Sequence, residues 1–206
     1  GGGDEIALFN GRDGEWIANL EVVGKRQLIL KVGNRHRAQA GGPDLWYLFS
    51  PLKHARLDYM VQKATELGVA VLQPVLTRFT QAERTNLDRM AANVREAAQQ
   101  CGILRIPEVR PPLRLDICLD HFPEARRLIF CDEAATGSPL ARLAALGEAP
   151  LAVLIGPEGG FADDERARLQ RQPNVVTISL GPRIMRADTA AVAALSLVNA
   201  AAGDWR

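Results

Sequence analysis

Short runs of apolar residues alternate with stretches of helical periodicity along most of this chain. Five runs predict β-strands, at residues 45–49, 69–75, 127–131, 151–155 and 175–180. The segments between them have the three-to-four-residue spacing of helices. Because strands that alternate with helices form parallel sheets covered on both faces, the pattern predicts an α/β fold around a parallel sheet.

Two helices are well defined in this pattern. Leu57, Met60, Val61 and Ala64 have the spacing of one helix face and predict a stripe that packs on the core, with Gly68 ending the helix. Residues 188–202 carry no charge after the first position and are rich in Ala, Val and Leu. They predict a helix buried nearly all round, too short for a bilayer, which takes about twenty residues.

The first part of the chain has a different pattern. Residues 6–9, 15–23 and 27–32 alternate as short antiparallel strands do, with the turn dipeptides Asn10-Gly11 and Asp13-Gly14. A small, turn-forming linker follows at residues 38–44. We therefore expect two domains, a β-rich module over residues 1–42 and the α/β domain over residues 43–206.

Composition and charge add a few constraints. With 206 residues, 47% of them hydrophobic, the chain can form one full α/β domain and a small module. The net charge of +1 does not by itself indicate nucleic-acid binding. Residues 78–114, however, hold seven arginines, a residue type suited to phosphate contacts: Arg78, Arg84, Arg89, Arg95, Arg105, Arg110 and Arg114. For each of them singly, a paired position on a solvated surface is an equal alternative.

The cysteines and histidines predict no metal site. Cys101, Cys118 and Cys131 are odd in number and lack C-x-x-C spacing, so they indicate core thiols in a reducing cytoplasm. The histidines are scattered among loop-like surroundings.

Two similar turns near the end of the chain hold the candidate chemistry. Each follows an apolar strand and begins with Gly-Pro, at residues 156–157 and 181–182. We expect both turns at the carboxyl edge of one sheet, where open α/β folds bind ligands. Their glycines leave bare backbone against which a flat ligand can lie. Neither the G-x-G-x-x-G fingerprint nor a P-loop occurs, which excludes the familiar nucleotide loops.

Four spaced motifs, QKATELGV at 62–69, EAAQQCG at 96–102, IGPEGGF at 155–161 and LGPRIMRADTA at 180–190, carry a likeness to a known family. They resemble the SPOUT class of S-adenosylmethionine (SAM) methyltransferases, and within it the bacterial 16S rRNA (uracil N3)-methyltransferases. The resemblance implies a C-terminal trefoil knot, SAM bound between the two Gly-Pro turns, and a homodimer formed through the last helix. It also implies a PUA-like RNA-binding domain at the front, of which the start is apparently lacking. A β appendage that merely packs on the main domain is the alternative for that module.

The resemblance implies that the protein methylates N3 of a uridine in the 16S rRNA of the small ribosomal subunit, with SAM and no metal. Its catalytic candidates are Arg186, Asp188 and Glu158. The expected cofactor-binding residues are Leu154, Ile155, Gly156, Gly159, Gly160, Leu180, Gly181, Ile184, Met185, Thr189 and Ala190. The expected RNA-binding residues are Arg35, Arg37, Lys25, Arg78, Arg84 and Arg105.

The three catalytic candidates have different expected roles. Arg186 would stabilise a uracil anion or hold the adjoining phosphate. Asp188 stands where the family usually has Glu, and it would cap a helix, act as a base or orient Arg186. Glu158 would act near the cofactor or pair locally.

Two other classes of function stay open from the sequence. One is an RNA-binding homologue that binds SAM with little or no turnover. The other is an unrelated α/β enzyme that takes a phosphorylated substrate at the two turns. An unrelated α/β enzyme would have no affinity for SAM. An RNA-binding homologue would bind SAM without turnover.

Overall fold

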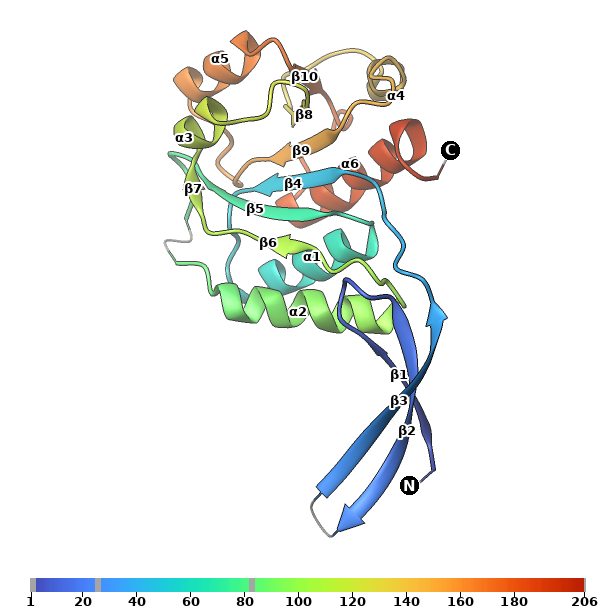
Figure 1. The fold of residues 1–206 in the computed structure, drawn as a ribbon. Coiled ribbons are helices and arrows are strands. Elements are labelled where there is room, and N and C mark those ends of the chain that lie inside the picture. The colour runs from blue at the N-terminus through green and yellow to red at the C-terminus, as the bar shows by residue number, and fades with distance from the viewer. Residues whose placement is uncertain (1–2, 25–26, 82–83, 206) are drawn as a thin grey trace.

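The computed structural model describes residues 3–24, 27–81 and 84–205 (Figure 1). Its elements in chain order are β1 (Glu5–Phe9), β2 (Glu15–Gly24), β3 (Gln27–Arg37), β4 (Leu45–Phe49), α1 (His54–Glu66), β5 (Val71–Leu76), α2 (Leu87–Gln100), β6 (Glu108–Val109), β7 (Leu113–Arg114), α3 (Leu115–Asp120), β8 (Arg127–Cys131), α4 (Pro139–Ala144), β9 (Leu151–Ile155), α5 (Asp163–Arg171), β10 (Val175–Ile178) and α6 (Ala187–Ala202).

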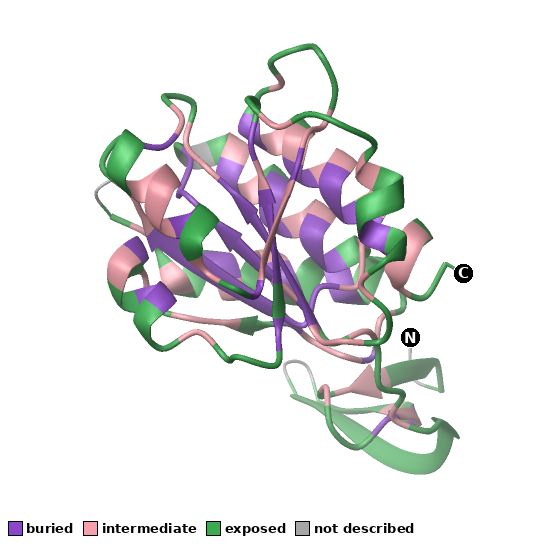
Figure 2. Cartoon of the chain, turned by 90° about the horizontal axis from the view of Figure 1, so that it is seen from above, coloured by how far each residue is buried: buried purple, intermediate pink, exposed green. Residues whose placement is uncertain are grey.

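A parallel sheet with strand order β10-β8-β9-β4-β5-β6 forms the larger part of the molecule, and β7 also pairs with β5. Successive side chains of a strand point to opposite faces, so each strand contributes to two cores. On β4, Tyr47 belongs to the cluster beneath α1, α2, α4 and α6, whereas Leu48 belongs to the cluster beneath α3 and α5. The sheet is therefore buried on both sides, which confirms the predicted α/β class (Figure 2).

β1, β2 and β3 form an antiparallel sheet that projects from the parallel domain (Figure 1). The β2–β3 pairs Leu20↔Leu30 and Val22↔Leu28 place apolar side chains on one face. On the other face, Lys31 pairs with Glu21 at 2.6 Å. The apolar face is open in the described structure, with Leu28 61% exposed.

Arginine side chains connect the β module to the parallel domain. Arg37 at the end of β3 forms a bidentate pair with Glu15 and also donates to the carbonyl of Gly102, which follows α2. Arg105 donates to the carbonyl of Gly42 at 2.9 Å. The linker is therefore held against the loop between α2 and β6.

The strands of the parallel sheet lie within two residues of their predicted bounds, because buried apolar runs are easy to recognise. The two-residue strands β6 and β7 were not predicted. The prediction that the last helix is buried nearly all round was wrong. Ala194 and Leu195 of α6 are fully buried, but Thr189 and Ala200 are exposed.

Within the described residues, no helix is long and apolar enough to cross a membrane. The chain crossing that would make the fold a trefoil knot stays a prediction from the resemblance.

Candidate active site

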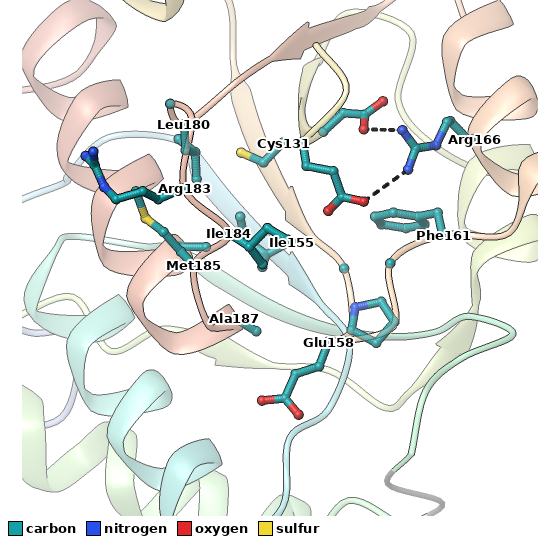
Figure 3. A pocket seen from close by; sticks show the side chains of 17 residues that line it. Cys131, Ile155, Glu158, Phe161, Arg166, Leu180, Arg183, Ile184, Met185 and Ala187 are labelled. Atoms are coloured by element: carbon teal, nitrogen blue, oxygen red, sulfur yellow. Dashed lines mark hydrogen bonds and ion pairs between the residues drawn. The ribbon is translucent and has the colours of Figure 1, made fainter.

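Three loops meet at one edge of the parallel sheet and line a pocket (Figure 3). They follow β8, β9 and β10, which are neighbours in the sheet and run in the same direction. Their carboxyl ends consequently lie at one edge, as the two Gly-Pro turns predict. The lining residues are Cys131, Asp132, Glu133, Ile155, Gly156, Pro157, Glu158, Gly160, Phe161, Arg166, Leu180, Gly181, Arg183, Ile184, Met185, Ala187 and Ala190.

The loop after β9 is shaped by Gly156 and Phe161. A Cβ atom at Gly156 would lie 2.4 Å from Cε2 of Phe161, so the Phe161 ring packs directly on bare backbone. The same ring meets Phe130 edge to face, with ring centroids 5.1 Å apart. Only glycine fits at position 156 while the ring holds this place.

Two other pocket glycines have backbone angles that disfavour side chains. Gly160 has a φ of 71° and Gly181 a φ of 107°, in the left-handed region. A Cβ at Gly181 would meet no atom within 4 Å, so conformation, not space, favours glycine there.

Eight of the eleven expected cofactor-binding residues line the pocket: Ile155, Gly156, Gly160, Leu180, Gly181, Ile184, Met185 and Ala190. The other three do not. Leu154 points into the core beneath α3 and α5, because alternate strand residues face opposite sides of the sheet. Gly159 packs against Phe79, and Thr189 is exposed on the first turn of α6.

Sequence reasoning missed the loop after β8. Asp132 is almost fully buried and pairs with Arg166 of α5, and Arg166 also approaches Glu133 at 3.5 Å. Burial raises the pKa of Cys131 to about 12, so its thiol is neutral. Residues 136–139, Thr-Gly-Ser-Pro, mark a turn after this strand, and together with the strand's position they could have pointed to the loop.

The catalytic candidates Asp188 and Glu158 are joined by a residue that the sequence did not single out. Arg56, in the first turn of α1, donates from Nε to Oδ2 of Asp188 at 3.1 Å and from Nη2 to Oδ1 at 3.0 Å. Its Nη1 donates to Oε1 of Glu158. One guanidinium therefore holds two carboxylates from distant parts of the chain.

This arrangement fixes the charge of both acids. The hydrogen bonds from Arg56 lower the pKa of Asp188 and the pKa of Glu158 below their ordinary values. Both are ionised at neutral pH and paired. Because both Asp188 oxygens accept from Arg56, the geometry does not favour a base role for this residue. Asp188 is also no helix cap, since it lies inside α6 and the N-cap position is Arg186.

Arg186 itself is in a different situation. Its side chain is exposed, and this side chain forms no hydrogen bond or ion pair within the described part of the chain. Its backbone carbonyl accepts from the N–H of Ala190. It lies between the lining residues Met185 and Ala187. Its positive charge contributes to the lowered pKa of Glu158. Arg186 is therefore an exposed cation beside the start of α6, and it is not itself one of the residues that line the pocket.

The expected RNA-binding residues are dispersed, and several have internal partners. Arg37 and Arg105 hold the linker, and Arg78 pairs with Asp164 at 2.7 Å. Arg35 and Arg84 are exposed. Lys25 lies outside the described residues.

The lining fits a mixed polar and apolar ligand such as SAM. Ile155, Leu180 and Met185 offer an apolar wall, and the turn glycines leave backbone groups accessible. Glu133 presents a carboxylate that can accept hydrogen bonds from hydroxyl or ammonium groups.

Comparisons with known proteins match both parts of the chain. A family model of the RNA methyltransferase domain matches residues 41–199, and one of the RNA methyltransferase PUA domain matches residues 3–33. Ribosomal RNA small subunit methyltransferase E of Rickettsia conorii is 30% identical over 198 residues, which are 95% of this chain and 80% of the relative.

Two solved structures are similar over nearly the whole chain. A methyltransferase from Legionella pneumophila in complex with the bound cofactor SAM is 31% identical, with a TM-score of 0.85, covering 98% of this chain and 85% of the other. A ribosomal RNA small subunit methyltransferase E from Neisseria gonorrhoeae bound to SAM is 25% identical, with a TM-score of 0.85, covering 100% and 86%.

Proposed function

This chain belongs to the RNA methyltransferase family, and we propose that it transfers a methyl group from SAM to N3 of a uridine in the 16S rRNA of the small subunit. The observation that carries the proposal is the pocket between the two Gly-Pro loops, which is also lined by the start of α6, the helix whose N-cap residue is Arg186. The SAM-bound relatives support the choice of cofactor.

The residues of the pocket bind and orient the cofactor. When bound, SAM supplies an electrophilic methyl group on a sulfonium. The backbone of the turns after β9 and β10 would hold its flat base, and Glu133 would accept hydrogen bonds from its polar groups. The Phe161 ring, packed on Phe130, forms an apolar part of the pocket wall.

N3 of the uracil must lose its proton, which passes to solvent because Arg56 holds both nearby carboxylates, and this loss places negative charge on O2 or O4. We assign the stabilisation of this charge to Arg186, whose exposed side chain forms no hydrogen bond or ion pair with the described side chains. Asp188 and Glu158 act through Arg56 rather than on the base itself. The target base would have to leave its stack to enter this pocket.

A titration calorimetry measurement with SAM, followed by methylation of small ribosomal subunits with labelled SAM, tests the proposal. We expect SAM binding, label in 16S rRNA, and N3-methyluridine after digestion of the RNA. SAM binding without label would instead indicate an RNA-binding homologue without turnover. Binding of phosphate compounds without SAM affinity would indicate another α/β enzyme.

We also propose that the protein acts in the cytoplasm, where small subunits are assembled, and that it is a homodimer. Part of the α6 surface supports the dimer, because Val192, Ala193 and Leu197 remain partly exposed. Sedimentation at micromolar concentration tests the dimer, and a well-folded monomer would contradict it.

Arg35 and Arg84 are the exposed arginines that we assign to rRNA phosphates.

A further inference from the structure

We propose that Arg56 is a positioning residue that keeps Arg186 available for the RNA, because it occupies the carboxylate that would otherwise capture Arg186. This inference rests on the proposed role of Arg186. That carboxylate belongs to Glu158, which lines the pocket from the loop after β9.

The contacts of Arg56 account for most of its donor groups. Nε and Nη2 are directed to Asp188, and Nη1 is directed to Glu158. A guanidinium has five N–H groups in a planar fork, and this fork matches two carboxylates at once. Arg56 side-chain exposure is 30%, so the cluster lies partly in solvent at the pocket mouth.

The neighbouring charges nearly balance while Arg56 is in place. Arg56 and Arg186 supply two positive charges, and Glu158 and Asp188 supply two negative ones. Without Arg56, the two carboxylates would lose the cation that now holds them. Opposite charges at short range attract even near a protein surface, so Arg186 would turn toward an acid instead of toward the anionic substrate.

The two acids differ as competitors for Arg186. Asp188 has 17% side-chain exposure and accepts a further hydrogen bond from the backbone of Thr189 at 3.0 Å. Glu158 has 45% side-chain exposure, accepts only from Arg56 among the described residues, and shares that guanidinium with Asp188, which lies two residues after Arg186 in the chain. Glu158 is therefore the acid that we expect to capture Arg186.

The test is a double-mutant cycle between Arg56→Gln and Glu158→Gln, with methylation of small subunits as the readout. Arg56→Gln should lower kcat by at least about tenfold, less than the roughly hundredfold or more of removing a charge-stabilising donor, because Arg186 is diverted and not removed. Glu158→Gln in the same chain should bring kcat back to within about threefold of the Glu158→Gln single variant. The matched control is Arg56→Gln/Asp188→Asn, whose kcat should stay as low as that of Arg56→Gln.

A merely structural role of Arg56 gives a different result, because the second substitution then cannot restore activity. Failure of the Arg56→Gln/Glu158→Gln variant to exceed Arg56→Gln would overturn the proposal. SAM affinity and circular dichroism show whether each variant is folded. Should Arg56→Gln not fold, Arg56→Lys takes its place, since an ammonium cannot serve both acids in the same fork geometry.

A crystal structure of the Arg56→Gln variant, or of Arg56→Lys in its place, gives a readout that does not depend on methylation. We expect the Arg186 guanidinium within ion-pair distance of the Glu158 carboxylate. An Arg186 side chain that stays free there would refute the inference even if the proposed activity is correct. The activity proposal fails separately if the unaltered protein binds SAM but does not label 16S rRNA.

Discussion

At the scale of single residues, Gly156 shows how closely the pocket loop is packed. Its α-carbon lies against the Phe161 ring, and a Cβ there would approach Cε2 to 2.4 Å. The ring is held in turn by Phe130. A methyl group at position 156 therefore has to displace a packed aromatic ring.

We predict that Gly156→Ala lowers the free energy of unfolding by about 1–3 kcal/mol, the usual cost of overpacking, and weakens SAM binding. Urea unfolding and calorimetry measure the two effects. Gly41→Ala is the control, because a Cβ at Gly41 meets no atom within 4 Å and its φ is not in the left-handed region. A stable Gly156→Ala protein with unchanged SAM affinity would contradict this account of the loop.

Arg186 gives the second prediction at this scale. Because its guanidinium acts on the substrate and not on SAM, Arg186→Ala should leave SAM affinity nearly unchanged and lower methylation by about a hundredfold or more. Arg186→Lys should recover little, since a point charge cannot reproduce the planar fork. Arg171→Ala on the exposed end of α5 is the matched control. Normal methylation by Arg186→Ala would remove this residue from the mechanism.

Asp188 gives a prediction about pH. Arg56 lowers the pKa of Asp188 below its ordinary value of 3.8, so the pair stabilises the folded state above that value and loses its effect as the pH falls further. We expect Asp188→Asn to cost on the order of 1 kcal/mol at pH 7. Thermal unfolding should show that the difference narrows below about pH 4. A difference that does not shrink at all as the pH falls from about 4 to about 2 would exclude the ion pair as its cause.

At the scale of elements, α6 has two unlike sides. Ala191 and Ala194 face α1, α4 and β9 inside the subunit, and Ala200 is exposed. The small residues of this helix therefore serve close packing within the chain. The dimer cannot be tested with a charge at Ala194, because that position is core.

We predict that Ala194→Asp unfolds the protein or lowers its stability by several kcal/mol, because an unpaired carboxylate would be buried. Ala200→Asp on the same helix should change the unfolding free energy by less than about 0.5 kcal/mol. Chemical denaturation of both variants compares them directly. Equal stabilities would show that the α6 packing described above is wrong.

The elements were easier to predict than the site. Strands such as β4 and β9 are continuous apolar runs, so their positions follow from burial alone. The Gly-Pro turns after β9 and β10 were recognisable by their glycines. Arg56 was not, because its partners Glu158 and Asp188 lie more than a hundred residues away in the chain, and only the folded sheet brings them together.

At the scale of the whole molecule, the β module and the parallel domain are held together by few polar contacts. Arg37 donates to the carbonyl of Gly102, and Gln39 donates to the carbonyl of Leu104 at 3.2 Å. Arg105, in the same loop as Gly102 and Leu104, donates to the carbonyl of Gly42 in the linker. These contacts limit the freedom of residues 38–44.

We predict that Arg37→Ala/Arg105→Ala increases the rate of proteolysis in this linker several-fold, because local opening becomes easier. The unfolding temperature of the parallel domain should change little, since its core is untouched. Arg35→Ala, an exposed arginine on the same strand β3, is the control. Equal cleavage rates for the double variant and the control would show that the linker is held by something else.

The strand order of the parallel sheet has a consequence for the order of events during synthesis. β4 can pair with β5 soon after both are made, but its other neighbour is β9, so one edge of β4 stays unpaired until residues 151–155 have been made. The pocket needs β8, β9, β10 and the start of α6, and its last lining residue is Ala190. On the ribosome, the β module can form early, whereas the cofactor site cannot exist until almost the whole domain has emerged. A nascent chain can therefore meet RNA before it is able to modify it.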